Sequence, residues 1–240
     1  NVGVEERIKQ IIVNLERMKW MPELPVFFIQ VNIPSYQLRV IDANKTVLSM
    51  KVIVGKTAHK TIIFSDTLKY IVFNPYWNIP SSIIKNEILP AMKKNASYLR
   101  RHSMEIIGSS GGYPIIRQRP GDNNALGRIK FLFPNRYNIY LHDTPSKELF
   151  GNNKRSFSHG CIRLRRPFAL ARLLLTTSNG LTPQAFDPLQ DSNKEQWITL
   201  TKPCPVFITY FTSWADENGI IHFISDIYGH DKKLASHLFK

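Results

Sequence analysis

Short β-rich segments separated by turn residues run through most of this 240-residue chain. Valine, isoleucine, threonine and aromatic residues dominate these segments, which is typical of strands. The segments span residues 26–31, 36–41, 46–54, 68–73, 129–133, 137–142, 197–200, 206–214 and 220–224. The series predicts a mainly β fold, and its first three members are expected to form an antiparallel meander.

Helical patterns occur before, within and after this series. Apolar residues recur at helical spacing over residues 4–18, which predicts an amphipathic helix that packs on a later part of the chain. Pro167 is expected to begin a second helix that runs to Leu175, because proline is tolerated in a first helical turn. A short helix is expected after Gly229. The predicted fold class is therefore mainly β with helices, or α+β.

Residues 81–126 lack the strand pattern of the segments on either side. Ser81 or Ser82 is expected to cap a helix that Pro90 kinks or restarts. The glycine-containing stretches 108–112 and 117–127 are expected to be loops. We therefore expect a helical and loop-rich insertion here that acts as a lid.

The positive charge of the chain is concentrated in its central part. The formal net charge is +14, and the stretch from Lys85 to Arg172 contains 17 Lys and Arg against 5 Asp and Glu. Such a field favours an anionic partner, namely nucleic acid, acidic lipid or a carboxylate-bearing polymer, although a solvated cationic face explains the charge equally well. The apolar runs fall far short of the roughly 20 residues that a membrane span needs. No membrane span is therefore expected.

The octapeptide FSHGCIRL, residues 157–164, contains one of only two cysteines. A cysteine becomes a nucleophile where an imidazole, a basic field or a helix N-terminus favours its thiolate. His142 is the better placed base for Cys161, because it ends a predicted strand and Asp143 can fix its tautomer. The Gly160 and Cys161 amides are then available to stabilise an oxyanion. The residues favour acyl transfer through a thioester.

Other interpretations of the same residues, without a catalytic cysteine, remain open from the sequence alone. A lone cysteine is often a small buried apolar residue, and a lone histidine is often a satisfied polar group. A metal site with His142, His159 and Cys161 as ligands is a further alternative. Cys204, between two prolines, is expected to be structural, and two cysteines form no disulfide framework.

The motif and its surroundings resemble the L,D-transpeptidase family, whose catalytic domain is called YkuD-like. That family carries a histidine, a spacer, Ser/Thr-His-Gly-Cys, an apolar residue and Asn or Arg. Here His142 is followed, after fifteen residues, by Ser158-His159-Gly160-Cys161-Ile162-Arg163. The segments VNIPSYQLRV, NPYWNIP and PGDNNALGRIKFLFPN look like the larger periplasmic members that carry an inserted capping subdomain. Nearly the whole chain takes part in the resemblance.

The resemblance implies a YkuD-like β-sandwich catalytic domain over residues 1–240, with the capping subdomain inserted at 81–126. Larger members usually also carry an upstream peptidoglycan-binding region, which this sequence lacks, so we expect the chain to represent the catalytic domain. The implied location is the periplasm or cell envelope. No metal or other cofactor is expected.

The implied reaction is peptidoglycan transpeptidation. The cysteine attacks the bond between the third and fourth residues of a tetrapeptide stem and releases D-alanine. A diaminopimelate-type amine of another stem then resolves the thioester in a 3→3 cross-link. Carboxypeptidase or endopeptidase action on wall peptides and attachment of a lipoprotein are the alternatives. Carbapenems are expected to acylate the cysteine, and nucleic acid is disfavoured as a partner because no recognition module accompanies the basic residues.

The resemblance also assigns roles to individual residues. Cys161 is the implied nucleophile, and His142 is the general base and acid, oriented by the main-chain carbonyl of Asp143. The implied oxyanion site consists of Gly160 and Cys161, with His159 beside them. The expected substrate-binding residues are Trp77, Tyr140, Ser158 and Arg163. A second class of function, a non-catalytic wall-binding module with a degenerate site, competes with this assignment.

Overall fold

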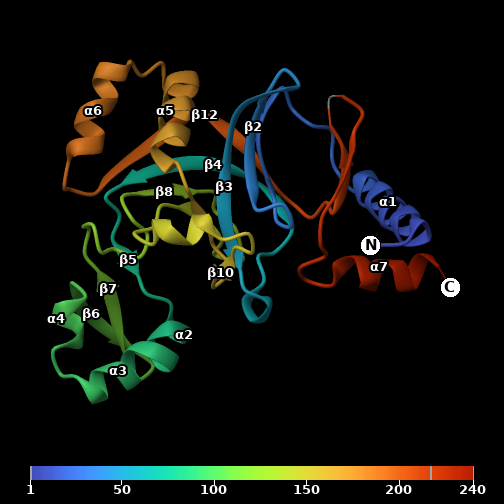
Figure 1. Ribbon diagram of the computed structural model, residues 1–240. Coiled ribbons are helices and arrows are strands. Elements are labelled where there is room, and N and C mark those ends of the chain that lie inside the picture. Colours follow the sequence, from blue (N-terminus) through green and yellow to red (C-terminus); the bar gives the residue numbers. More distant parts are fainter. Residues whose placement is uncertain (1, 217, 240) are drawn as a thin grey trace.

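A nine-stranded sheet forms the body of the protein in the computed structural model, which describes residues 2–216 and 218–239 (Figure 1). The strand order is β10-β3-β11-β9-β8-β4-β12-β1-β2, and β2 also pairs with β3, so the sheet closes on itself. Its strands are β1 Phe27–Asn32, β2 Gln37–Asp42, β3 Lys45–Gly55, β4 Phe64–Phe73, β8 Ile129–Leu132, β9 Leu141–His142, β10 Ser156–Ser158, β11 Ile162–Leu164 and β12 Gln196–Thr209. The expected α+β class is confirmed.

The main hydrophobic core draws on all the long strands and on helices α5 (Pro167–Asn179) and α6 (Pro183–Asp191). Both helices lie together on one side of the sheet in Figure 1. The ring of Phe186 in α6 meets Phe73 of β4 edge to face, with 5.8 Å between the ring centroids. The helix expected from Pro167 is confirmed, whereas α6 was not expected.

The meander expected at the start of the sheet is confirmed. β1 pairs antiparallel with β2, and β2 pairs antiparallel with β3. Ala43 and Asn44 between the last two strands both have positive φ, as a tight two-residue hairpin turn requires. The turn residues therefore set the register of this hairpin.

Two of the expected strands have different bounds. The segment 137–142 contributes only β9, because the Asn135 side chain hydrogen-bonds the backbone of Tyr137 and Ile139 and holds a loop there. The segments 197–200 and 206–214 were expected to be separate strands, but a single strand, β12, runs through the first segment and ends within the second at Thr209. Its pairing with β4 shifts register between Thr199 and Cys204, next to Pro203, and a bulge of this kind tolerates proline within a strand.

The inserted stretch has a small sheet and a hydrophobic cluster of its own. Its strands are β6 Met104–Ser110 and β7 Tyr113–Gln118, and β5 Trp77–Asn78, just before the insertion, joins this sheet beside β7. Its helical segments are α2 Ser81–Ile83, η2 Ile84–Ile88, α3 Leu89–Lys94 and α4 Tyr98–Arg101. Ile79, Ile84, Ile88 and Ile116 form the cluster. The expectation of a loop at 108–112 was wrong, since Gly111 and Gly112 turn a β-hairpin with positive φ at both positions.

Pro90 falls directly after a π-helical turn, η2. Proline lacks the N–H that an α-helix needs and clashes with the carbonyl four residues earlier. The wider turn accommodates both effects, so Pro90 restarts the helix as α3. The helix before it begins at Ser81 after Pro80, and no serine side chain caps it.

The N-terminal helix α1 (Val4–Lys19) packs against α7 (His230–Leu238) and the hairpin of β13 (Ser213–Ala215) and β14 (Ile221–Phe223). The face that it buries is mainly polar, with Asn14 and Arg17 buried beside Val13. The apolar positions instead point outward, and Val4 is 76% exposed and Leu15 53%. The helix and its packing on a later part of the chain are confirmed, but its apolar stripe is not the packed face.

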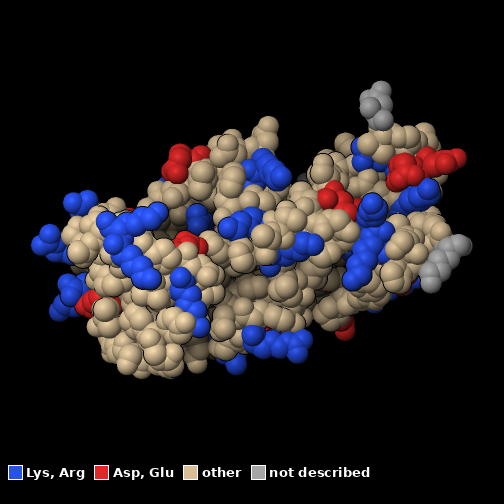
Figure 2. All heavy atoms as spheres, turned by 90° about the horizontal axis from the view of Figure 1, so that it is seen from below, with Lys and Arg blue, Asp and Glu red and all other residues tan. Residues whose placement is uncertain are grey.

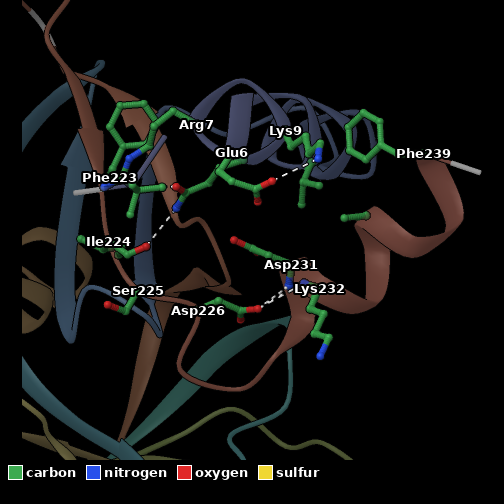
Figure 3. Close-up of a pocket in the computed structure, with 14 residues that line it drawn as sticks. Glu6, Arg7, Lys9, Phe223, Ile224, Ser225, Asp226, Asp231, Lys232 and Phe239 are labelled. Atoms are coloured by element: carbon green, nitrogen blue, oxygen red, sulfur yellow. Dashed lines mark hydrogen bonds and ion pairs between the residues drawn. The ribbon is translucent and has the colours of Figure 1, made fainter. Parts of the chain in front are cut away.

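Polar partners explain this orientation. The Asn14 amide donates to the Thr212 hydroxyl at 2.8 Å, and Arg17 forms an ion pair with Asp231 at 2.6 Å. A cavity of about 740 Å³ lies between α1 and α7, where Arg7 stacks on Phe223 and Gln10 donates to the Ile224 carbonyl (Figure 3). No helix within residues 2–216 and 218–239 has both the length and the apolarity of a membrane span.

Candidate active site

Strand pairing brings the two halves of the sequence motif together. β9 and β11 lie side by side and parallel, with Leu141 opposite Ile162 and His142 opposite Arg163. The Ile162 N–H donates to the Tyr140 carbonyl at 3.1 Å, which places Cys161 beside Tyr140. Residues two apart on a strand share a face, so Tyr140, His142, Cys161 and Arg163 are directed to one side of the sheet.

The loop that carries the cysteine is closed by Ser158. Its hydroxyl donates to the Cys161 carbonyl at 2.5 Å and accepts the Gly160 N–H at 3.1 Å. Ser158 is buried, and both functions of its hydroxyl are used within the loop. Ser158 thus orders the turn that carries Cys161, and these contacts give no support to its expected substrate-binding role.

Gly160 adopts φ +115°, a conformation that L side chains rarely take. Its N–H is held by Ser158, so the expectation that this amide is free for an oxyanion is not met in this conformation. Among the hydrogen bonds of the described residues, none takes the Cys161 N–H. The Cys161 N–H is therefore available to donate to a ligand.

A second network fixes the loop from the other side. The Thr61 hydroxyl donates to the Gly160 carbonyl at 2.7 Å and accepts the Gly55 N–H at 2.9 Å. The Tyr228 hydroxyl donates to the Gly55 carbonyl. A Cβ on Gly55 would lie 2.0 Å from the His59 carbonyl oxygen, so only glycine fits there. The loop before β4 is thereby locked against the cysteine loop.

His142 is buried, and its Nδ1 lies 2.5 Å from the main-chain carbonyl oxygen of Asp143. A carbonyl oxygen only accepts, so Nδ1 carries the proton and Nε2 presents a lone pair. Burial, with the nearby charge of Arg163, lowers the pKa of His142 to about 3. The imidazole is therefore neutral and able to accept a proton.

Cys161 is half-buried, and its Sγ donates to the Asn138 carbonyl at 3.6 Å. Burial raises the pKa of the thiol, while hydrogen bonding from Tyr140 and the charges of Lys130 and Arg163 act in the opposite direction. The resting site thus holds a neutral thiol and a neutral imidazole on the same face of the sheet. A nucleophilic attack by this thiol would require proton transfer to a base, as in general base catalysis.

The Asp143 carboxylate supports the segment that holds His142. It accepts the Arg128 N–H at 2.9 Å and forms an ion pair with Lys147. Gly127 packs so closely that a Cβ would lie 2.4 Å from the carboxylate. The side chain of Asp143 thus anchors the strand end, and its carbonyl orients the imidazole.

Aromatic residues from the sheet and from the insertion meet beside the thiol. The half-buried Tyr140 ring lies 5.6 Å from the His142 ring. Burial raises the pKa of Tyr140, hydrogen bonding with Cys161 acts in the same direction, and hydrogen bonding with Trp77 of β5 acts against it. Lys130 of β8 lies over the Tyr140 ring, 4.3 Å from its centroid. Tyr140 thus lies beside Cys161, and Trp77 lies beside Tyr140.

His159 is directed elsewhere. Its Nε2 contacts a Glu87 carboxylate oxygen of η2 at 3.2 Å, and its ring lies 5.0 Å from that of His59. These contacts link the cysteine loop to the insertion and give no support to an oxyanion role. No three His, Cys, Asp or Glu side chains in the described part of the chain converge as metal ligands would, so the metal alternative gains no support either.

The other expected residues have clear positions. Arg163 is half-buried, and its buried Nε has no hydrogen-bond partner among the described residues. Cys204 is 2% exposed and packs in the main core, which confirms its structural role. The cavity of Figure 3 is lined by none of the residues around Cys161, so it is a separate feature of the protein.

Sequence reasoning missed Lys130, Thr61 and Gly127. Lys130 occupies an alternating strand position, where a lysine usually faces solvent. Thr61 and Gly127 lie in loops whose contacts depend on tertiary structure. The sequence predicts a loop at 117–127 and carries the family resemblance there, but it does not indicate the contact between Gly127 and Asp143.

Comparison with known proteins identifies relatives of this chain. The model of the L,D-transpeptidase catalytic domain, YkuD, matches residues 27–183. A Haemophilus influenzae protein described as "Putative L,D-transpeptidase" is 34% identical over 244 residues, an alignment that covers 94% of this chain and 49% of that protein. The chain thus spans about half the length of this curated relative.

Solved structures give weaker matches. An L,D-transpeptidase from Mycobacterium smegmatis matches with a TM-score of 0.38 and 13% identity, over 77% of this chain and 58% of that one. The L,D-transpeptidase LdtMt1 in complex with imipenem matches with a TM-score of 0.38 and 16% identity, over 77% of this chain and 59% of that one.

Proposed function

Because this chain belongs to the YkuD family of L,D-transpeptidase catalytic domains, we propose that it forms 3→3 cross-links between the stem peptides of peptidoglycan. The observation that carries the proposal is the parallel pairing of β9 and β11, which directs Cys161 and His142 to one face of the sheet. The hydrogen bond from Nδ1 to the Asp143 carbonyl supports His142 as the base, since it leaves Nε2 unprotonated.

In the first half-reaction the Cys161 sulfur attacks the carbonyl carbon of the third stem residue. The thiol proton passes to Nε2 of His142, and the Cys161 N–H stabilises the oxyanion. The C–N bond to the fourth residue then breaks, and the departing amine of D-alanine takes the proton from Nε2. A thioester between Cys161 and the shortened stem remains.

In the second half-reaction the side-chain amine of another stem attacks the thioester carbonyl. His142 takes a proton from this amine and returns it to the sulfur as the C–S bond breaks. An amide cross-link and the resting thiol result. Water as acceptor would give carboxypeptidase or endopeptidase products, and a lipoprotein amine would give an attached lipoprotein.

The insertion is proposed to act as a capping subdomain over residues 81–126 of the catalytic domain. Strand β5, just before the insertion, brings Trp77 next to Tyr140, and η2 of the insertion contacts the cysteine loop through Glu87 and His159. Basic side chains outnumber acidic ones on the face that Figure 2 presents, in keeping with the charge of residues 85–172. Such a surface would concentrate a carboxylate-rich polymer, which fits a protein of the periplasm or cell envelope.

The direct test is incubation of the purified chain with a disaccharide-tetrapeptide and analysis of the products by mass spectrometry. We expect free D-alanine and a 3→3 linked dimer. Cys161→Ala should abolish both products while it shifts the unfolding temperature by only a few degrees, and Cys204→Ala is the matched control that retains them. Shortened monomer without dimer would instead indicate a carboxypeptidase.

A second test separates an enzyme from a wall-binding module with a degenerate site. Meropenem mimics the acyl donor, so we expect one drug-derived adduct on the intact protein. Cys161→Ala should remove the adduct and Cys204→Ala should keep it. A wild-type protein that gains no mass would contradict the nucleophilic role of Cys161.

A further inference from the structure

Two cations flank the candidate base in a row across three strands. Lys130 of β8 is the register partner of His142 on one side, and Arg163 of β11 is its partner on the other. Neighbouring strands are about 4.8 Å apart, and directly paired residues share a face. Both cationic side chains therefore flank the same imidazole.

Neither cation has an anionic partner in the described part of the protein. No carboxylate of the described residues lies within 4.0 Å of either charged group, in contrast to Lys147, which pairs with Asp143. The buried Nε of Arg163 lacks a hydrogen-bond acceptor. The opposite charge that would act most on both cations is that of an ionised Cys161 sulfur, ahead of the more distant Glu195 on Lys130 and Glu148 on Arg163. Glu195 is itself engaged with the Tyr76 N–H at 2.9 Å.

Burial raises the pKa of the Cys161 thiol, so the resting site holds no negative charge opposite the two cations and their partial burial is costly for folding. Desolvation disfavours both cations, and it lowers the pKa of Lys130 and the pKa of Arg163. A partly buried charge without a counter-ion loses hydration that nothing replaces. An anion that entered the site would restore the missing interaction.

The position of the Lys130 ammonium identifies the kind of anion. It lies 4.3 Å from the centroid of the Tyr140 ring, and Tyr140 is next to Cys161. A cation over an aromatic face keeps its N–H donors free for an anion at the rim of the ring. The anion therefore belongs to the part of a ligand that lies close to the reacting sulfur.

We propose that Lys130, together with Arg163, forms a subsite for the α-carboxylate of the donor residue that follows the scissile bond. This rests on the proposed function. That carboxylate lies only a few bonds from the carbonyl carbon that Cys161 attacks. A donor with one residue after the scissile bond places its carboxylate between the cations, whereas a longer donor places an uncharged amide there. The subsite thus selects the length of the donor stem.

Binding to an inactive protein tests the subsite without requiring turnover. In the Cys161→Ala background, the dissociation constants of a tetrapeptide stem with a free C-terminus and of its C-terminal amide are measured by calorimetry. A charge-assisted hydrogen bond predicts that the acid binds roughly ten- to hundredfold more tightly than the amide. Adding Lys130→Met should remove most of this preference and leave binding of the amide unchanged.

Lys69→Met is the control for loss of one positive charge, since Lys69 is exposed on the neighbouring strand β4. It should keep the preference for the acid. Equal affinity of acid and amide in the Cys161→Ala protein would overturn the proposal, as would a Lys130→Met effect of equal size on both peptides. Lys130→Gln repeats the test if the methionine variant unfolds.

Turnover by the wild-type chain separates the two proposals. Cross-linking of the free-acid donor with equal use of the amide would retain the proposed function and reject the subsite. A strong preference in binding without any cross-linking would retain the subsite and reject the function. For active protein, Lys130→Met should raise KM for the acid donor far more than it lowers kcat, whereas a role of Lys130 in thiol activation alone would lower kcat for both donors and reject the subsite.

Discussion

The buried imidazole of His142 should make the stability of this protein depend on pH in a defined window. Burial and the charge of Arg163 lower its pKa to about 3 in the folded state. In the unfolded chain the same group titrates near 6.5. Between these values the unfolded chain binds a proton that the folded protein does not, so the free energy of unfolding falls as the pH decreases from about 6.5 towards 3.

The magnitude follows from the two pKa values. At pH 5 the unfolded histidine is almost fully protonated while the folded one is neutral. One pH unit in this window corresponds to about 1.4 kcal/mol, so lowering the pH from 7 to 5 costs about 2 kcal/mol of stability through this residue. That is a large fraction of the stability of a typical domain.

His142→Asn isolates the contribution, because an asparagine amide donates to the Asp143 carbonyl and does not titrate. Urea unfolding of both proteins at pH 7 and pH 5 gives the four free energies required. We expect the difference between wild type and variant to move by about 2 kcal/mol in favour of the variant at pH 5. Other histidines with lowered pKa, such as His159 and His230, act equally in both proteins. A difference that is the same at both pH values would refute the reasoning.

Two further predictions concern packing. Gly127→Ala should destabilise the protein by about 2 kcal/mol or more in urea unfolding, because a Cβ would lie 2.4 Å from the Asp143 carboxylate and φ is +59°. Gly151→Ala, where a Cβ meets nothing within 4 Å, should change stability by less than about 0.5 kcal/mol. Ile8→Lys, on the exposed stripe of α1, should be similarly neutral, whereas Val13→Ala should cost about 1 to 3 kcal/mol. A larger loss from Ile8→Lys would mean that the stripe is packed.

The sequence motif predicted His142 and Cys161 as the reactive pair, and the spacing between these two residues has a structural explanation. Parallel neighbouring strands need a crossover connection, because a tight turn only joins antiparallel strands. The residues between His142 and Cys161 form this crossover, which contains the short helix η3 (Lys147–Gly151) and strand β10 on the edge of β3. The sequence alone could not reveal that β9 and β11 are neighbours, since this depends on pairing across the whole sheet.

The helix α1 shows the limit of periodicity. Its apolar spacing predicts a helix, but the side chains that fix its orientation are Asn14 and Arg17, whose partners Thr212 and Asp231 lie about 200 residues later in the chain. Hydrogen bonds between such distant segments leave no local signal in a sequence. The same holds for Lys130, whose position beside His142 follows only from the register between β8 and β9.

The two cations also connect donor binding to the basicity of His142. Arg163 and Lys130 both lower the pKa of His142 in the free protein, after the larger effect of burial. If a donor carboxylate binds between them, its negative charge offsets theirs, and the pKa of His142 should rise towards its ordinary value. The base would then be strengthened at the moment when the carbonyl carbon reaches the sulfur. NMR titration of the His142 ring in the Cys161→Ala protein, with the free-acid tetrapeptide and with its amide, measures this directly. A rise with the acid alone is expected, and an equal shift with both peptides would assign the change to desolvation by the bound chain and not to the carboxylate.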